Sequence, residues 1–245
     1  MGKSRQNLKV LLLQIREGGQ VREEEHASFA AYSGLQPQQI EVLNVFDTPD
    51  FADTVADDYD ALFVGGASEA NVLKPDEFPF VEASQALLRR CAEINKPVFA
   101  SCFGFQLVVL ALGGEILHKD DDFEMGTLPI LLTDTSLDDP LFKDVPNGFH
   151  AVSVHRQYAK ELPDCCEVIA YTSQCIHVLR VKDKPFWAFQ FHPEVDKSTL
   201  VERLTHYKAH YTDGDGHLDR VLSSAVETPD SNQLVAKFVD RVLLG

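Results

Sequence analysis

A nearly continuous apolar run, Leu8–Ile15, constrains the fold of this 245-residue chain more than any other feature of its sequence. A strand that is apolar on both faces must be covered on both faces, as in parallel sheets flanked by helices. Similar runs return at Tyr59–Val64 and Pro97–Ser101, and segments with helical spacing lie between them. This alternation predicts an α/β fold with a doubly wound, mostly parallel sheet flanked by helices.

The remaining elements follow from the same periodicities. Helices are predicted up to Gly34, over Asp76–Asn95, Phe103–Leu112, Asp196–Tyr211 and Asn232–Leu244. Further strands are predicted over Ile40–Phe46, Thr127–Thr133, Phe149–Val154, Glu167–Tyr171, Cys175–Val181 and Pro185–Phe191. A flexible break is expected at Thr212–Gly216. We therefore expect one domain over residues 1–212 and a helical extension over residues 213–245 that packs on it.

Charge and hydropathy exclude several classes of function. The chain carries 22 Lys and Arg against 38 Asp and Glu, a net charge of −16. Nucleic-acid binders need a basic face, so a nucleic-acid partner is not expected. No apolar run reaches the roughly 18–20 residues that span a bilayer, and Val10–Ile15 is too short for a signal-peptide core. A cytoplasmic protein without a membrane partner is expected.

The segment Ala100–Gln106 has the layout of a nucleophile elbow with Cys102 at its turn. A buried strand ends and a helix begins within one residue of this cysteine, and Gly104 lets the two pack closely. The positive end of a helix stabilises a thiolate. The N–H of Phe103 would point to where an oxyanion forms. The motif is short, so a buried structural cysteine at a strand end is the alternative.

A thiolate nucleophile needs a general base, and His192 is the candidate. Among nine histidines it alone ends a strongly apolar run, Phe186–His192, before Pro193 and Glu194. Side chains at the carboxyl ends of parallel strands gather on one edge of the sheet, so His192 and Cys102 could converge. Glu194 is placed to orient the imidazole. The alternative is a strand that ends in an exposed polar turn.

No metal site is predicted. The five cysteines are an odd number, which indicates free thiols, and no Cys/His cluster has metal-binding spacing. The four cysteines other than Cys102 are expected to be small buried hydrophobes. They are Cys91, Cys165, Cys166 and Cys175. The acidic stretch Asp120–Asp122 is interpreted as a solvated turn.

Together, Cys102, the Phe189–Val195 segment and the Gly65–Gly66 pair resemble the class I (triad-type) glutamine amidotransferase family, from about Leu8 to about Tyr211. Within this family the chain resembles the glutaminase domain of GMP synthase, and the resemblance implies a flavodoxin-like core. The resemblance implies that Cys102 is the nucleophile, His192 the base and Glu194 its orienting partner. It also implies that Gly66 and Phe103 supply oxyanion N–H groups, and that Gln106 helps to hold glutamine.

The activity implied by the resemblance is glutamine hydrolysis through a Cys102 thioester, without a metal or organic cofactor. Ammonia would pass to a separate synthetase or acceptor protein, because the chain has no P-loop ATP motif. The family's Gly two residues before the cysteine is Ala100 here, and its Ser-His-x-Asp stretch corresponds to Val154–Gln157, with Val154 and Gln157 as departures. Hydrolysis of γ-glutamyl peptides or amides by the same triad is the alternative. A non-catalytic binding or regulatory protein is a third interpretation.

Overall fold

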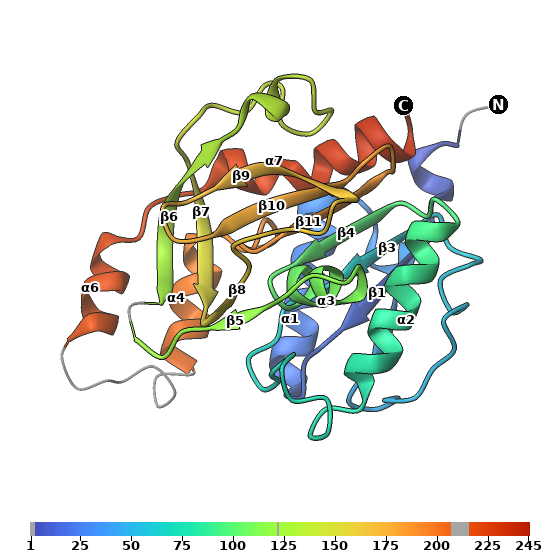
Figure 1. Cartoon of the computed structure of the whole chain (residues 1–245), viewed down its shortest axis with the longest axis horizontal. Coiled ribbons are helices and arrows are strands. Elements are labelled where there is room, and N and C mark those ends of the chain that lie inside the picture. Colours follow the sequence, from blue (N-terminus) through green and yellow to red (C-terminus); the bar gives the residue numbers. More distant parts are fainter. Residues whose placement is uncertain (1–2, 122, 207–215) are drawn as a thin grey trace.

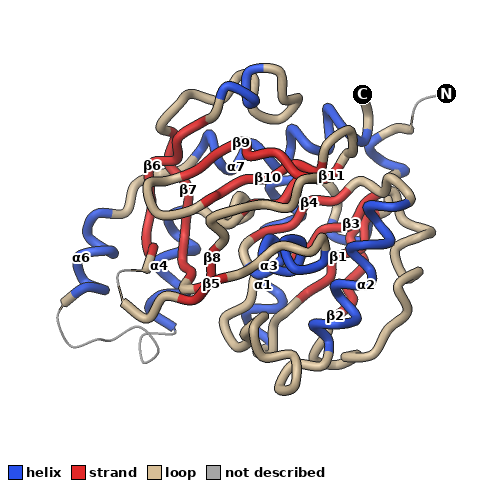
Figure 2. Tube along the Cα trace, viewed as in Figure 1, coloured by secondary structure: helices blue, strands red, loops and turns tan. Residues whose placement is uncertain are grey.

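The computed structural model describes residues 3–121, 123–206 and 216–245. Its centre is a nine-stranded sheet in the order β2-β1-β3-β4-β11-β10-β9-β6-β7 (Figures 1 and 2). These strands are β1 (Val10–Gln14), β2 (Ile40–Asn44), β3 (Ala61–Val64), β4 (Val98–Ser101), β6 (Glu124–Leu132), β7 (Phe149–His155), β9 (Cys166–Tyr171), β10 (Ile176–Val181) and β11 (Phe186–Phe189). A second, two-stranded sheet pairs β5 (Leu117–His118) with β8 (Gln157–Tyr158).

The strands that lead into the predicted elbow and histidine segments lie in the parallel part of the sheet. β1 pairs in parallel with β2 and β3, and β4 pairs in parallel with β3 and β11. Every residue of β1 is buried, as a strand covered on both faces requires. The α/β fold class is confirmed. Beyond β11 the neighbours β10, β9, β6 and β7 pair in antiparallel, which extends the sheet by strands from the second half of the chain.

Helices cover both faces of the sheet (Figure 1). One apolar cluster joins α2 and α3 to side chains such as Leu13 and Val64, and the other joins α1 and α7 to Leu12 and Phe63. A third cluster packs α4 and α6 against β6 and β7. The helices are α1 (Gly19–Ser33), α2 (Phe80–Glu93), α3 (Phe103–Ala111), α4 (Lys197–His206), α6 (His217–Ser224) and α7 (Pro229–Phe238), followed by a π-helical turn over Val239–Leu243. Short 3₁₀ turns lie at Arg5–Asn7, Pro37–Gln39 and Asp134–Leu137.

Helix α7 packs into the same core as the sheet. The ring of Phe238 lies 6.1 Å from that of Phe63, 5.4 Å from Phe99 and 6.1 Å from Trp187, measured between centroids. The Asn232 amide donates hydrogen bonds to the carbonyls of Pro193 and Val195, so α7 also holds the loop that carries Glu194.

Several expected features fall partly outside the described residues. The structure does not describe the end of the helix predicted over Asp196–Tyr211 or most of the break predicted at Thr212–Gly216. Asp122 of the acidic stretch also lies outside the described residues. The proposed division at residue 212 lies there too and stays a prediction. In the part of the chain that the structure describes, no helix is both long and apolar enough to cross a bilayer.

The close contact between β4 and α3 leads to a stability prediction. A Cβ on Gly104 would lie 2.9 Å from Val64 Cγ1 and 3.1 Å from the Cβ of Ala100, closer than packed atoms tolerate. Gly104→Ala should therefore lower the free energy of unfolding by about 1–3 kcal/mol, measured by urea denaturation. Gly19→Ala is the matched control, because nothing lies within 4 Å of a Cβ there. An equal effect in both variants would contradict this packing.

Candidate functional site

Cys102 is the single residue between β4 and α3, and its backbone has a conformation that few non-glycine residues adopt. Its φ is +50° and its ψ is −99°. Such strain costs about 1–3 kcal/mol and persists only where the surroundings enforce it. The Cys102 N–H donates to the Phe189 carbonyl at 2.7 Å, which fastens the elbow to β11. The side chain is only 4% exposed and lies at the N-terminus of α3.

His192 and Glu194 lie in the loop after β11, and His192 interacts with the Cys102 thiol at the start of α3. The strand is predicted from the sequence to run to Phe191, but β11 ends at Phe189, so His192 lies three residues beyond the strand instead of directly at its end. The His192 N–H donates to the Val152 carbonyl at 2.8 Å, and this bond fixes the loop against β7. The imidazole Nδ1 lies 2.7 Å from Glu194 Oε1, and both side chains are buried.

The imidazole also interacts with the thiol of Cys102. Burial lowers the pKa of His192, but the charge of Cys102, the charge of Glu194 and hydrogen bonds to both outweigh it and raise this pKa to about 9. Burial acts to raise the pKa of Glu194, yet the neighbouring His192 holds it below its usual value. The ionised Glu194 carboxylate and the imidazolium of His192, next to the Cys102 sulfur, form an arrangement that can exchange a proton with a substrate.

This pKa shift predicts how stability depends on pH. Because the pKa of His192 rises from 6.5 in the unfolded chain to about 9 in the folded protein, its contribution is complete below pH 6.5. That contribution should disappear as the pH rises towards 9. We expect the difference in unfolding free energy between the wild type and His192→Gln to shrink over this interval, in urea titrations at several pH values. A difference that stays constant would contradict the shift.

Gly66 lies directly against the imidazole. A Cβ at this position would lie 2.6 Å from His192 Cε1 and 3.1 Å from Arg16 Nη2, so no larger residue fits without displacing the histidine. Phe103 is the first residue of α3, where backbone N–H groups have no intrahelical acceptor. Both residues are buried beside the elbow. Their roles as oxyanion donors stay predictions.

A buried ion pair next to Gly66 was not predicted from the sequence. Arg16 Nε lies 2.9 Å from Glu25 Oε1, and the two side chains are 1% and 0% exposed. A second guanidinium nitrogen of Arg16 donates to Ser68. The signal was present in α1, where Glu25 lies at helical spacing between the buried Val21 and Phe29. A carboxylate in an apolar stripe needs a buried partner, which Arg16 provides.

The stretch Val154–Gln157 lies beside the thiol. The Cys102 sulfur is 3.8 Å from the Val154 carbonyl oxygen, and the Gln106 amide donates to the Gln157 carbonyl at 3.2 Å. A cavity of about 290 Å³ is lined by this stretch together with Ser68. The two departures from the family pattern, Val154 and Gln157, therefore line this cavity, and the Val154 carbonyl also contacts the thiol. Gln106 is buried and uses its amide to hold this wall.

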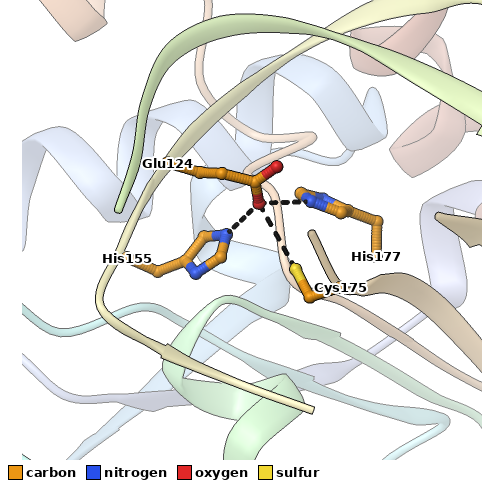
Figure 3. Close-up of side chains that lie close together, drawn as sticks. All are labelled: Glu124, His155, Cys175 and His177. Carbon is orange, nitrogen blue, oxygen red and sulfur yellow. Dashed lines mark hydrogen bonds and ion pairs between the residues drawn. The ribbon is translucent and has the colours of Figure 1, made fainter. Parts of the chain in front are cut away.

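Four buried side chains form a second polar cluster that the spacing of the sequence did not indicate. Glu124, His155, Cys175 and His177 each present one donor atom, and these atoms all lie within 4.8 Å of one another (Figure 3). Their atom types are those that bind transition metals. Cys175 therefore does more than fill the core. The expectation that Cys165 is buried was wrong, because it is exposed, whereas Cys91 and Cys166 are buried as expected.

Comparisons with known proteins agree with the fold and the motifs. The model of the class-I glutamine amidotransferase family matches residues 33–208. A subunit of the glutamine-hydrolyzing GMP synthase of Methanococcus maripaludis is 38% identical over 100 residues, which are 40% of this chain and 51% of that protein. Its counterpart from Methanocaldococcus jannaschii is 32% identical over 118 residues, 48% and 61% of the two chains. This chain thus matches little more than half the length of these relatives.

The fold likeness extends over nearly the whole chain. The crystal structure of a glutamine amidotransferase from Thermotoga maritima superposes with a TM-score of 0.76 at 15% identity, covering 97% of this chain and 99% of that one. The resemblance deduced from the motifs is confirmed, because the family model spans well over half of the residues. This chain belongs to the class-I glutamine amidotransferase family.

Proposed function

We propose that this protein hydrolyses the side-chain amide of glutamine, with Cys102 as nucleophile, His192 as acid and base and Glu194 as the residue that orients it. The observation that carries the proposal is the buried imidazole of His192, which lies 2.7 Å from Glu194 and interacts on its other side with the thiol at the start of α3. Family membership supports the same chemistry. Nothing about folding requires a strained cysteine, a histidine and a glutamate to meet at one sheet edge.

The reaction proceeds in two balanced steps. The Cys102 thiolate attacks the amide carbon and a C–S bond forms, while the oxyanion accepts hydrogen bonds from the N–H groups of Gly66 and Phe103. The C–N bond then breaks, and the leaving nitrogen takes the His192 proton and departs as ammonia. His192 next removes a proton from water, which attacks the thioester carbonyl. Glutamate is released and the thiolate is restored.

We propose further that the ammonia passes to a separate partner protein. The relatives from Methanococcus maripaludis and Methanocaldococcus jannaschii are each named as one subunit of the glutamine-hydrolysing GMP synthase, which supports a function divided between separate chains. The net charge of −16 suits a partner with a basic docking surface. If such a partner couples the reactions, its addition should raise the rate of glutamine hydrolysis.

A second candidate substrate, a γ-glutamyl peptide, is favoured by the residues that line the cavity of about 290 Å³ next to Val154. The guanidinium of Arg156 lies over the Phe123 ring at 3.8 Å, and both residues line this cavity with Val154 and Gln157. A cation held there suits the carboxylate of an amino acid that leaves in place of ammonia.

One experiment separates these functions. The purified protein is offered glutamine and a panel of γ-glutamyl dipeptides, with Cys102→Ser as the background, and the release of ammonia and of amino acids is measured. Ammonia from glutamine as the preferred product supports the amidotransferase function. Preferred release of amino acids would assign the peptide substrate instead. Turnover of neither substrate, with no labelling of Cys102 by a glutamine-like electrophile, would overturn both in favour of a binding role.

A further inference from the structure

The cluster of Glu124, His155, Cys175 and His177 lies in the antiparallel half of the sheet and takes no part in the chemistry above. Glu124 begins β6, His155 ends β7, Cys175 directly precedes β10, and His177 is the second residue of β10. Three strands therefore direct one carboxylate, two imidazoles and one thiol to a single point (Figure 3).

The donor atoms meet at one oxygen of the carboxylate. Glu124 Oε2 lies 3.0 Å from His155 Nε2, 2.8 Å from His177 Nε2 and 3.3 Å from Cys175 Sγ. In a tetrahedral zinc site with bonds of about 2.0–2.3 Å, the ligand atoms lie roughly 3.3–3.8 Å apart. Small rotations of the side chains bring the four atoms to these separations around a common centre.

One ring nitrogen of His155 is hydrogen-bonded, and the other lies in the cluster without a hydrogen-bond partner. Nδ1 lies 3.1 Å from the Gln157 carbonyl, which can only accept, so this nitrogen carries the proton. In the neutral ring, Nε2 then presents a lone pair towards a carboxylate oxygen. It makes no hydrogen bond although the side chain is only 4% exposed. A cation between the two groups would satisfy both.

The surroundings resemble the outer shell of a metal centre. Histidine ligands of metals almost always donate their other ring N–H to a carbonyl or carboxylate, as His155 does to Gln157. The other Glu124 oxygen accepts a hydrogen bond from the Thr172 hydroxyl at 2.7 Å, which fixes the carboxylate. A cavity of about 370 Å³ reaches Glu124, His155 and Cys175 and gives an ion a route from the surface.

We propose that Glu124, His155, Cys175 and His177 form a binding site for a divalent transition metal, with Zn²⁺ as the best fit. Mixed nitrogen, sulfur and oxygen ligands in a four-coordinate arrangement suit Zn²⁺, whereas Mg²⁺ and Ca²⁺ prefer oxygen ligands alone. Four protein ligands make the site a structural one. The metal joins β6, β7 and β10, and through His155 it holds the Val154–Gln157 wall next to Cys102.

Titration of the reduced, chelator-treated protein with Co²⁺ tests the site directly. We expect one equivalent to bind, with visible bands of a four-coordinate ion and a near-ultraviolet sulfur-to-cobalt band. Cys175→Ser should abolish the near-ultraviolet band and weaken binding by at least about 100-fold. Cys165→Ser, which changes an exposed thiol, should leave both unchanged. Zn²⁺ should raise the melting temperature of the wild type and of Cys165→Ser but not of Cys175→Ser.

Two results would overturn the proposal. Wild-type protein without a sulfur-to-cobalt band would show that the cluster is a network of hydrogen bonds only, and this result needs no variant. The second result is equal cobalt binding by the wild type, Cys175→Ser and His177→Gln, with circular dichroism showing that each protein is folded. It would place the ion elsewhere on the surface. Because these measurements use no substrate, their outcome is independent of the proposed hydrolysis of glutamine.

Discussion

Replacing Cys102 with Ser should lower kcat for amide hydrolysis by roughly 10⁴-fold or more, the scale seen when a triad nucleophile is removed. The serine hydroxyl has nearly the same size but is hardly ionised near neutral pH, so no effective nucleophile remains at the start of α3. The elbow should persist, because its N–H bond to the Phe189 carbonyl does not involve the side chain. Initial rates of ammonia release at saturating glutamine give the measurement.

The control for this variant is Cys165→Ser, which removes an exposed thiol that has no part in the proposed mechanism. Its activity should match that of the wild type, and both variants should remain folded, with a cooperative unfolding transition in urea. Retained activity in Cys102→Ser would remove the nucleophile from the mechanism.

Replacing Glu194 with Gln should lower kcat by roughly 10³–10⁴-fold while it leaves the packing nearly unchanged. The carboxylate lies 2.7 Å from His192 Nδ1 and favours the tautomer in which Nδ1 carries the proton and Nε2 can accept one. An amide NH₂ in its place can donate to Nδ1, which turns the imidazole into the wrong tautomer for accepting a proton from Cys102. The carboxylate also stabilises the imidazolium, and a neutral amide does not. The measurement is kcat together with its pH profile.

Glu202→Gln serves as the matched control, because this residue lies on α4 and is exposed. It removes the same charge from the chain and should leave kcat within about twofold. If Glu194→Gln kept wild-type kcat and pH dependence, Glu194 would be a structural residue and His192 would need another partner.

The elements that position the site are those that local patterns predict well. The run Leu8–Ile15 gives β1, and the segment that ends at Ser101 gives β4 followed at once by α3. Both signals come from neighbouring residues, because a doubly buried strand and a strand-to-helix elbow are visible in a few consecutive positions. Boundaries were less accurate, since β11 ends at Phe189, where the turn to His192 begins.

The second polar cluster illustrates what the sequence could not reveal. Glu124, His155 and the pair Cys175 and His177 are separated by up to 53 positions and meet only because β6, β7 and β10 belong to one sheet. Strand order in the antiparallel half depends on long-range pairing, which no local period encodes. Metal motifs are recognised in a sequence by the short spacing of their ligands, so this criterion does not detect a site whose ligands come from separate strands of a sheet.

The buried ion pair of Arg16 and Glu25 was not predicted from the sequence, for a related reason. Glu25 looks like one more acid in a polar helix until its position between Val21 and Phe29 is considered. Arg16 follows the apolar run directly and has the appearance of a residue that ends a strand at the surface. Only the packing of α1 on the sheet brings the two charges within 2.9 Å of each other, with Glu25 next to Gly65 and Arg16 next to Gly66.

The most direct measurement is covalent labelling with a γ-glutamyl electrophile, followed by peptide mass spectrometry. We expect one adduct per chain, located on Cys102, formed more slowly in His192→Gln and suppressed by excess glutamine. The exposed Cys165 is an internal standard for ordinary thiol reactivity within the same molecule. An adduct on Cys165 with none on Cys102, or labelling of Cys102 that neither glutamine nor the loss of His192 affects, would contradict the account.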